Sequence, residues 1–401
     1  MRPRYALPLI AAAAMSVGCT PNGGAASGSN HSGAEDGARG ASWGGNAGSI
    51  EGAALTAAPF TLTEVARFSD PWAIAFLPGD NGALVTEKGG RLMWWRPGGA
   101  AREVAGAPRV AVAGQGGLGD VVLDPDFATN RRVWLSWAAA GEGQTRGAVV
   151  GHATLSADMS RITGLTEVWR QVPFVTGAGH YGHRIAFGPD GKLYISSGER
   201  QKFDPAQDRA SNLGKVVRLN RDGSVPADNP FAREGGVTAQ LWSTGHRNPL
   251  GLAFTGQRLW VLEMGPQGGD ELNLIRRGAN YGYPLASNGD HYDGRVIPDH
   301  REGDGFAAPA LWWNPAISPG SLHIVGGQAM RGWQGTALIG ALGGTGLVQV
   351  AFDGDQARQV ARWNLDMRIR AIGEASDGTL YLVEDGGNRG QGRLFRLAPR
   401  G

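Results

Sequence analysis

Cysteine, charge and helical periodicity are all scarce in this 401-residue chain. Cys19 is its one cysteine, so no disulfide can form within the chain, and a core of this size needs none. Charged residues make up 18%, and no long amphipathic helical pattern is present, which argues against an α-helical protein. Glycine (66), proline (22) and tryptophan (13) are abundant instead, a composition that favours turns and strands.

The amino terminus resembles a bacterial export signal. Arg2 and Arg4 precede an apolar run from Leu7 to Met15, which is too short to span a bilayer. Small residues then lead to Cys19, an order similar to that of lipoprotein signals, in which the cysteine is lipidated and becomes the first residue. We therefore predict a signal peptide over residues 1–18 and lipidation at Cys19, with plain secretion as the alternative.

Export also sets the expected charge and location. Residues 1–18 hold two arginines and no acidic residue, so their removal takes the formal net charge from +2 to zero. A neutral chain has no electrostatic footprint for nucleic acid. Residues 19–59 are rich in Gly, Ser and Ala and are expected to form a flexible tether. We expect a periplasmic protein anchored in the membrane by a lipid at Cys19. By resemblance to bacterial sorting signals, the absence of Asp at position 20 favours the outer membrane.

Residues 60–401 repeat a pattern of apolar run, tight turn and apolar run. About six segments share this pattern, and they begin at Pro71, Gly117, His183, Gly251, Gly335 and Ile369. Irregularly spaced repeats of paired strands are typical of propeller blades with long insertions between them. We predict an all-β, six-bladed β-propeller over residues 60–401. A β-sandwich is the alternative and explains the number of repeats poorly.

The stretch from Gly245 to Pro284 has the densest group of polar functions. It contains a guanidinium (Arg247), an amide (Asn248) and two carboxylates (Asp270 and Glu271) between short apolar runs. Glycines and prolines interrupt any helical period, so we expect these side chains to lie on loops. In a propeller the loops of one face converge on the central channel, where histidines and arginines from other blades can join them.

Five blocks of sequence carry a resemblance to a known family: GQGGLG at Gly114, GHYGHRIAFGPDGKLYISSGE at Gly179, GHRNPLGLAF at Gly245, EMGPQGGDELNLIRRGANYGYP at Glu263 and MRIRAIG at Met367. The chain resembles the soluble PQQ-dependent aldose sugar dehydrogenases, the glucose/sorbosone dehydrogenase family, from about residue 60 to the end. The resemblance implies a six-bladed propeller that binds pyrroloquinoline quinone (PQQ) and calcium. It also implies oxidation of the C1 hydroxyl of aldoses to a lactone.

The resemblance aligns His180 with the family's catalytic histidine. Oxidation at C1 requires removal of the hydroxyl proton, and a neutral imidazole suits that task. A histidine hydrogen-bonded at a strand entry is the alternative interpretation of His180. His183 is a competitor for the role of base, although the family usually has a small residue at that place.

By resemblance, five residues match the PQQ contacts of the family: Gln115, Arg247, Asn248, Arg368 and Arg370. Planar guanidinium groups suit the three carboxylates of PQQ, and Arg247 would also polarise the reacting oxygen. Arg368 and Arg370 are two residues apart, so on a strand both face the same side. A solvated strand edge is the alternative for this arginine pair.

The resemblance also implies calcium contacts: the Gly265 and Pro266 backbone oxygens at the cofactor, and at a second, structural calcium Glu271, the Tyr281 carbonyl and nearby Asp270. Calcium prefers such oxygen ligands. The sequence alone leaves another account open, in which Asp270 and Glu271 cap a turn or pair with Arg276 and Arg277.

The chain departs from the family at two expected cofactor contacts, since Leu250 stands where glutamine is typical and Gly343 where lysine is common. A second function therefore stays open, that of a cofactor-free, lipid-anchored propeller that binds carbohydrate or an envelope partner. Trp312 and Trp313 could stack on sugar in either case, whereas most tryptophans are expected in the blade core. A calcium-dependent lactonase is a third reading. The sequence identifies neither the sugar nor the electron acceptor.

Overall fold

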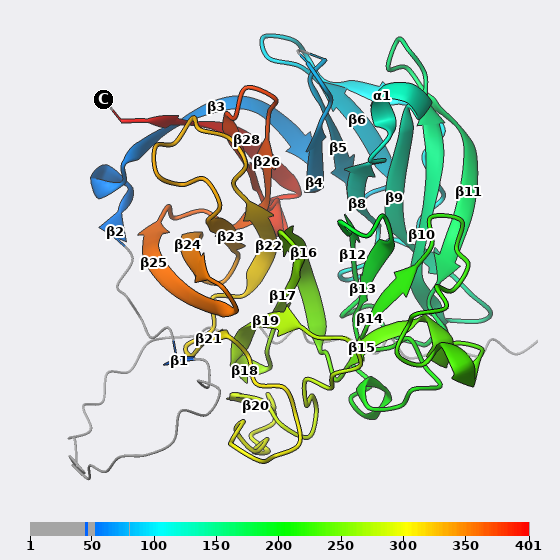
Figure 1. The fold of residues 1–401 in the computed structure, drawn as a ribbon. Helices are drawn as coiled ribbons and strands as arrows, with labels where there is room; N and C mark the ends of the chain where they lie inside the picture. Colours follow the sequence, from blue (N-terminus) through cyan, green and yellow to red (C-terminus); the bar gives the residue numbers. More distant parts are fainter. Residues whose placement is uncertain (1–44, 47–52, 80, 401) are drawn as a thin grey trace, which may run out of the picture. The chain divides into compact units, whose positions relative to one another are not determined.

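Six β-sheets of four or five strands make up most of the structure, a computed structural model that describes residues 45–46, 53–79 and 81–400 (Figure 1). The six innermost strands contact one another in a closed ring, β4 to β8, β12, β16, β22, β26 and back to β4. This ring confirms the all-β, six-bladed propeller and excludes a sandwich of two sheets. The only α-helix of the described residues is α1 (Phe127–Asn130).

From the channel outward, the first three blades consist of the following strands: β4 (Pro71–Phe76), β5 (Ala83–Glu87), β6 (Arg91–Trp95) and β7 (Arg102–Val104); β8 (Leu118–Leu123), β9 (Arg132–Ala140), β10 (Arg146–Leu155) and β11 (Ile162–Arg170); and β12 (Gly182–Phe187), β13 (Leu193–Ser197), β14 (Lys215–Leu219) and β15 (Leu241–Thr244). The connections of blade 3 contain three 3₁₀ turns: η2 (Asp204–Ala206), η3 (Ala232–Glu234) and η4 (Thr238–Gln240).

Blades 4 to 6 consist of these strands: β16 (Asn248–Thr255), β17 (Arg258–Met264), β19 (Asp270–Ile275), β21 (Leu311–Trp313) and β1 (Gly45–Asn46); β22 (Pro319–Ile324), β23 (Ala337–Ala341), β24 (Gly346–Asp353), β25 (Gln356–Asn364) and β2 (Ala53–Ala54); and β26 (Ile369–Glu374), β27 (Leu380–Glu384), β28 (Gln391–Pro399) and β3 (Phe60–Ser69). The remaining elements are a two-stranded sheet of β18 (Gln267–Gly268) and β20 (Gly289–Asp290) and two 3₁₀ turns, η1 (Leu55–Ala57) and η5 (Gly387–Arg389).

Stacking of the blades explains the composition of their middle strands. Every residue of β5, β13, β23 and β27 is buried, because neighbouring blades cover both faces of each sheet. Such strands read as continuous apolar runs rather than as alternating ones. Four large tryptophans, Trp95, Trp134, Trp260 and Trp313, are fully buried between blades, as expected for the tryptophan-rich composition.

The first and last strands of the propeller domain close the ring. β3 pairs antiparallel with β28, from Phe60 opposite Pro399 to Ser69 opposite Gln391. The amino-terminal strand is thus the outermost strand of blade 6, although the other strands of that blade come from the end of the chain. Closure by distant strands prevents the first and last blades from separating unless this long ladder is broken.

Short segments before residue 60 also belong to the described structure. β1 pairs parallel with β21, and β2 pairs parallel with β25, within the range that the sequence assigned to a tether. Ordered pairing therefore begins earlier than residue 60 on two blades. The signal peptide over residues 1–18, Cys19 and the remainder of the tether range lie outside the described residues.

Every inner strand has a bulge close to its start. The register shifts between residues 71 and 73, 118 and 121, 182 and 185, 249 and 251, 319 and 321, and 369 and 371. A bulge bends the strand and turns the side chain of its extra residue. Repeated six times around the ring, it directs side chains such as Trp72, His183 and Arg370 toward the mouth of the channel.

One buried arginine connects five of the six inner strands. Arg184 on β12 donates to Asp120 Oδ1 on β8 (3.0 Å), to the Leu250 carbonyl on β16 (2.8 Å) and to the Gly320 carbonyl on β22 (2.6 Å). Its guanidinium also lies 3.8 Å from the ring centroid of Trp72 on β4. The guanidinium therefore lies at the level of the bulges and fixes these inner strands relative to one another.

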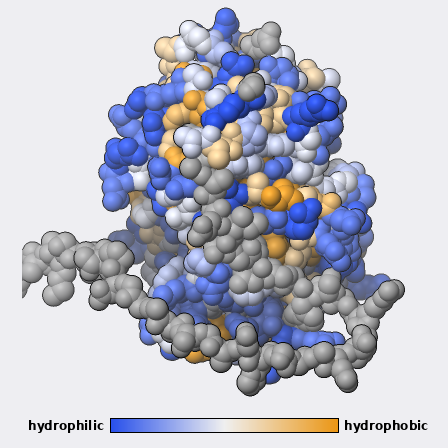
Figure 2. Space-filling model, turned by 90° about the vertical axis from the view of Figure 1, so that its left-hand side faces the viewer, coloured by the Kyte–Doolittle hydropathy of each residue, from blue (hydrophilic) through white to orange (hydrophobic). Residues whose placement is uncertain are grey.

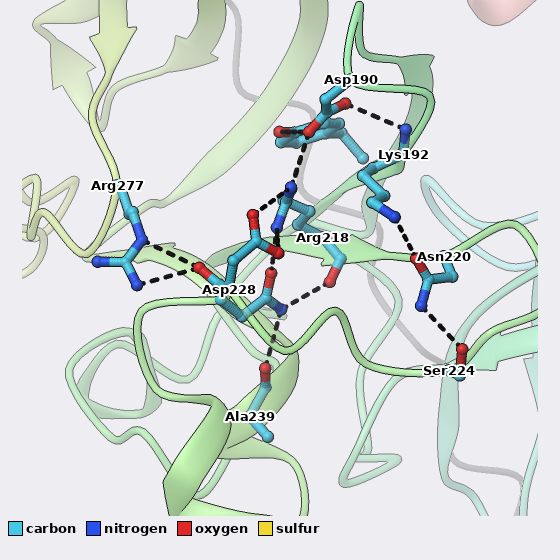
Figure 3. Close-up of polar contacts among 10 residues, drawn as sticks. Asp190, Lys192, Arg218, Asn220, Ser224, Asp228, Ala239 and Arg277 are labelled. Carbon is cyan, nitrogen blue, oxygen red and sulfur yellow. Dashed lines mark hydrogen bonds and ion pairs between the residues drawn. The ribbon is translucent and has the colours of Figure 1, made fainter.

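A second arginine network holds the long connection between β14 and β15 (Figure 3). Arg218 Nε and Nη2 donate to Asp190 Oδ2 (3.0 and 2.9 Å), and Nη1 donates to Asp228 Oδ1 (2.9 Å). Arg277, which follows β19 in blade 4, donates to the Asp228 carbonyl (3.1 and 3.0 Å). The connection is thus tied both to its own blade and to the next one.

The face in Figure 2 is mainly hydrophilic, and its hydrophobic residues form small groups. The low charge content of the chain is therefore compatible with a largely polar surface on this side. Within the part of the chain that the structure describes, no helix has the length and apolar character needed to cross a membrane.

Replacement of Asp120 tests the buried arginine connection. We expect Asp120→Ala to lower the free energy of unfolding by about 3–5 kcal/mol, because it leaves the Arg184 charge buried without its carboxylate. Urea-induced unfolding followed by fluorescence measures this change. The exposed Arg209–Glu234 pair is the matched control, and Glu234→Ala should cost less than about 1 kcal/mol. Equal effects of the two substitutions would contradict the role of Arg184.

Candidate functional site

A polar cavity of about 300 Å³ opens where the inner strands begin. Residues from five blades line it, and among them are four of the five residues that the sequence analysis matched to PQQ contacts: Gln115, Asn248, Arg368 and Arg370. His180 and Arg247 lie beside the cavity wall, next in sequence to its lining residues Tyr181 and Asn248. The propeller therefore brings together residues that are up to 255 positions apart, as the gap from Gln115 to Arg370 shows.

His180 lies two residues before β12 and is held from two sides. Its backbone N–H donates to Gln115 Oε1 (2.7 Å), and its ring Nδ1 is hydrogen-bonded to Glu199 Oε1. The other oxygen of Glu199 accepts the backbone N–H of Phe203 (2.8 Å). His180 has a φ of +47°, an uncommon conformation for a residue other than glycine. The loop after β13 thus fixes the carboxylate, and the carboxylate fixes the imidazole.

Glu199 also determines which nitrogen of His180 remains free. A carboxylate only accepts hydrogen bonds, so Nδ1 carries the hydrogen and Nε2 keeps its lone pair. Burial lowers the pKa of His180, Glu199 raises it and the charge of Arg247 lowers it, which leaves the pKa below its ordinary value. Burial raises the pKa of Glu199, but its hydrogen bond with His180 and other favourable contacts outweigh burial, and the pKa is lowered. The pair is therefore a neutral imidazole on a charged carboxylate.

Arg247 immediately precedes β16 and reaches the loop after β17. Its Nη1 donates to the carbonyls of Met264 (3.1 Å) and Gly265 (2.6 Å). Its Nε and both polar atoms of the Asn248 side chain are buried without a hydrogen-bond partner among the described residues. Each such atom costs about 1–3 kcal/mol when unpaired. These atoms are consequently well placed to bind a polar ligand.

Arg368 and Arg370 share one carboxylate at the cavity. Arg368 Nε donates to Asp385 Oδ1 (3.1 Å), and Arg370 Nε donates to Asp385 Oδ2 (2.8 Å), so the two arginines face the same side, as their spacing predicts. Burial raises the pKa of Asp385, but the two guanidiniums outweigh burial and lower it. One carboxylate between two guanidiniums leaves a net positive charge at this part of the wall.

Asp270 fixes the turn that presents the Gly265 and Pro266 carbonyls. Its carboxylate accepts the backbone N–H groups of Gly265 (3.0 Å), Ile317 (2.7 Å) and Ser318 (2.7 Å). Burial raises the pKa of Asp270 to about 7 despite these hydrogen bonds. Asp270 thus joins blade 4 to the start of blade 5 and acts as a turn cap, one of the two alternatives that the sequence left open.

Glu271 belongs to a buried group that is rich in acceptors. The Asn273 amide donates to both Glu271 Oε2 and Glu263 Oε1 (3.1 Å each), and the Asn273 side-chain oxygen has no partner among the described residues. Burial and the neighbouring Glu263 raise the pKa of Glu271 well above its ordinary value. His246 bonds to Glu263 (2.8 Å) and stacks on the Tyr281 ring at 4.9 Å. Two carboxylates here have little positive charge near them.

The departures from the family pattern are built into the local packing. Leu250 lines the cavity with an apolar side chain, while its carbonyl is bound by Arg184. A Cβ at Gly343 would lie 2.6 Å from Ser318 Oγ, so a side chain there would require Ser318 to move. The space of a longer side chain is therefore already occupied at Gly343.

The expectation that the polar residues between Gly245 and Pro284 lie on loops is wrong for three of them. Asn248, Asp270 and Glu271 are not on loops, because Asn248 starts β16 and the two acidic residues start β19. Proline and glycine occur inside β16 because its bulge, between Pro249 and Gly251, accommodates them.

The suggested sugar stacking by Trp313 is also wrong. Its side chain is fully buried, and its Nε1 donates to Gln359 Oε1 (2.8 Å). Among the described residues, Asp270 and Glu271 do not pair with Arg276 or Arg277. Arg276 pairs with Asp355 instead, and Arg277 donates to the Asp228 carbonyl.

The sequence analysis missed the acidic partners of the site. Glu263 is the second-to-last residue of β17, the second strand of its blade, and Glu199 and Asp385 follow the second strands β13 and β27 by two positions and one position. An acidic residue that closes an apolar strand, as in LYISSGE or LYLVED, is a signal that could have found Glu199 and Asp385. Lys88 was missed too; it lines the cavity and pairs with Asp70 at 3.2 Å.

Removal of the Glu199 charge tests the electrostatics of His180. We expect Glu199→Gln to lower the pKa of His180 further, because burial and Arg247 remain while the favourable carboxylate is lost. An NMR titration of the His180 ring measures this pKa, and Glu167→Gln at the exposed Arg170 pair is the control.

The same lowered pKa predicts a pH effect on stability. The unfolded chain binds a proton at a pKa of about 6.5, above the folded value. The contribution of His180 to stability is therefore lost as the pH falls from about 6.5 through the folded pKa. A higher pKa of His180 in the Glu199→Gln variant would contradict the electrostatic role assigned to Glu199.

Comparison with known proteins agrees with the fold and the site. The model of the family "Glucose / Sorbosone dehydrogenase" matches residues 68–396. Aldose sugar dehydrogenase YliI of Escherichia coli (strain K12) is 39% identical over 358 residues, which cover 86% of this chain and 95% of that protein. The crystal structure of the soluble aldose sugar dehydrogenase from Escherichia coli in the apo-form has a TM-score of 0.81 at 38% identity and covers 85% of this chain and 100% of that one.

A structure with cofactor is also similar. The PQQ-bound form of aldose sugar dehydrogenase from Streptomyces coelicolor has a TM-score of 0.70 at 28% identity, with 86% of this chain and 100% of that chain covered. The resemblance inferred from the sequence blocks is confirmed by these matches. The chain belongs to the glucose/sorbosone dehydrogenase family of oxidoreductases.

Proposed function

We propose that this protein oxidises aldose sugars at C1 to the lactone, with PQQ and calcium as cofactors. The observation that carries the proposal is the buried, neutral His180, held by Glu199 and placed near Arg247 beside a polar cavity. Two relatives support it, one named an aldose sugar dehydrogenase and one described in a PQQ-bound form.

The cavity residues fit the chemistry of PQQ. Its carboxylates require positive charge, which Arg368 and Arg370 retain because they share only Asp385. Its carbonyl and ring groups require amide partners, and both polar atoms of Asn248 lack one. When bound, PQQ supplies a quinone that accepts two electrons from the sugar as hydride. Leu250 would contact the quinone through apolar surface rather than through a hydrogen bond.

Calcium fits two places near this cavity. The Gly265 and Pro266 carbonyls are presented on the turn that Asp270 fixes, and a hard cation prefers such oxygens. At the second place, a cation would offset the repulsion between Glu271 and Glu263. No group of three or more His, Cys, Asp or Glu side chains in the described parts of the chain could hold a metal. Backbone oxygens would therefore complete both sites, with the Tyr281 carbonyl at the second one.

The residues of this chain move the proton and hold the reacting oxygen. His180 Nε2 has a free lone pair and accepts the proton of the C1 hydroxyl as hydride leaves the same carbon. Glu199 then stabilises the imidazolium that forms, since its carboxylate already binds Nδ1. Arg247 is positioned to donate to the sugar oxygen through its unpartnered Nε. The proton is stored on the histidine, and the lactone is the product.

Reconstitution of the protein with its cofactors tests the proposed function. We expect the calcium-loaded protein to bind PQQ stoichiometrically and to reduce an artificial dye with glucose or other aldoses, and chelation of calcium should abolish dye reduction. His180→Ala should retain PQQ binding but lose about 10²–10⁴-fold in kcat, because the general base is removed. Isothermal titration and a steady-state dye assay measure the two effects.

The control is a histidine outside the site. His152 on β10 packs against Trp134 in blade 2, so His152→Ala should leave kcat unchanged. Absence of PQQ binding at micromolar cofactor would exclude the proposed reaction. The cofactor-free propeller that binds carbohydrate would then be the function to test, by screening glycans.

We further propose that the protein is periplasmic and anchored by a lipid at Cys19, with the outer membrane favoured. The support is the charged, apolar and small-residue order of residues 1–19. We expect wild-type protein in the membrane fraction to be labelled by a fatty-acid analogue, and Cys19→Ala to be unlabelled and soluble. An unlabelled wild-type protein released into the periplasm would instead indicate plain secretion.

A further inference from the structure

His183 occupies a position in the cavity wall where the resemblance leads one to expect a small residue. Its ring stacks on Trp72 with centroids 5.0 Å apart and an interplanar angle of 12°, and its Nδ1 is 2.7 Å from Ser136 Oγ. A Cβ at Gly119 would lie 1.9 Å from His183 Cε1, so the ring fits only because residue 119 is glycine. Three residues from two neighbouring blades, Trp72, Gly119 and Ser136, thus surround this imidazole.

The contacts around His183 compensate for its unfavourable backbone conformation. His183 has a φ of +55°, in the left-handed region that glycine adopts freely and histidine rarely does. A residue kept in such a conformation needs contacts that over-determine it. The stacking on Trp72 and the hydrogen bond to Ser136 supply those contacts.

The hydrogen bonds of Ser136 fix the tautomer of His183. Ser136 Oγ already accepts the backbone N–H of Asp120 (2.8 Å), and among the described residues His183 Nδ1 is its only other hydrogen-bond partner. The hydroxyl hydrogen is satisfied only if it points to Nδ1, which must then be the acceptor. The hydrogen of the neutral ring is therefore on Nε2, the polar ring atom left for the cavity that His183 lines.

The charge state agrees with this assignment. Burial lowers the pKa of His183 to about 3, and the nearby Arg184 and Arg200 contribute in the same direction. The ring is consequently neutral at any working pH, and unlike His180 it has no carboxylate partner. His183 is unsuited to the role of base for which the sequence made it a competitor, but it is suited to donate one fixed hydrogen bond.

We propose that His183 Nε2–H donates a hydrogen bond to an oxygen of the quinone cofactor and thereby takes over part of the polar contact that Leu250 and Gly343 no longer provide. This inference rests on the proposed function, because it requires a quinone in the cavity. Leu250 and His183 line the same cavity. A ligand there would therefore lose a polar contact at Leu250 and gain one at His183. The residue is a binding residue, distinct from the His180–Glu199 pair.

Two amide substitutions separate the two ring nitrogens. The amide of asparagine overlays Nδ1 and can pair only with Ser136, whereas the longer glutamine carries its amide to the place of Nε2. We expect His183→Asn to weaken PQQ binding about tenfold and His183→Gln to stay within about threefold of the unaltered protein. Asparagine adopts the left-handed region readily, so the first variant should fold.

The measurement is a titration of each calcium-loaded protein with PQQ, followed by quenching of tryptophan fluorescence, with thermal unfolding as the check on folding. Equal affinity of His183→Asn and the unaltered protein would overturn this inference alone. Absence of PQQ binding by the unaltered protein would overturn both this inference and the proposed function. Independently of any cofactor, the ¹⁵N chemical shifts of the His183 ring should show the Nε2–H tautomer, and an Nδ1–H tautomer would also overturn the inference.

Discussion

The ion pair between Arg184 and Asp120 is the constraint on which the rest of the structure depends. A propeller leaves an open channel along its axis, and here a buried guanidinium from β12 lies in the channel and contacts groups on four other inner strands. Because a buried charge is costly without partners, those strands have little freedom to shift relative to one another. The bulges next to the Arg184 guanidinium then present their side chains at fixed positions around the cavity.

Buried pairs of a basic group and a carboxylate also occur around the cavity. Four basic residues of the site are held by buried carboxylates: Glu199 binds the His180 ring, Glu263 accepts the backbone N–H of Arg247, and Asp385 binds Arg368 and Arg370. These carboxylates come from the ends of second strands, whereas the basic groups come from the starts of inner strands. Neighbouring strands of one blade thus assemble pre-oriented pairs, and such pairs need no reorganisation when a ligand or a developing charge arrives.

Sequence reasoning was most successful where the signal is local and repeated. Strand pairs with tight turns at Pro71, His183 and Ile369 mark blades 1, 3 and 6, and the turn-rich composition excluded helical folds. It was less successful at Pro319–Ile324, the inner strand of blade 5, where the repeat was recognised only from Gly335, which lies beside β23. It also placed Asn248 and Asp270 on loops, because a bulge allows proline and glycine inside a strand and local periodicity cannot reveal a bulge.

The sequence by itself determined the fold class, the family and four residues that line the cavity, Gln115, Asn248, Arg368 and Arg370, because each depends on short blocks of adjacent residues. Only the tertiary structure decided how these residues are paired. Glu199 lies 19 residues from His180, and Ser136 lies 47 residues from His183, yet each sets the tautomer of its histidine. Ring closure brings such groups within hydrogen-bond distance, and a contact between distant blades leaves no periodic trace in the chain.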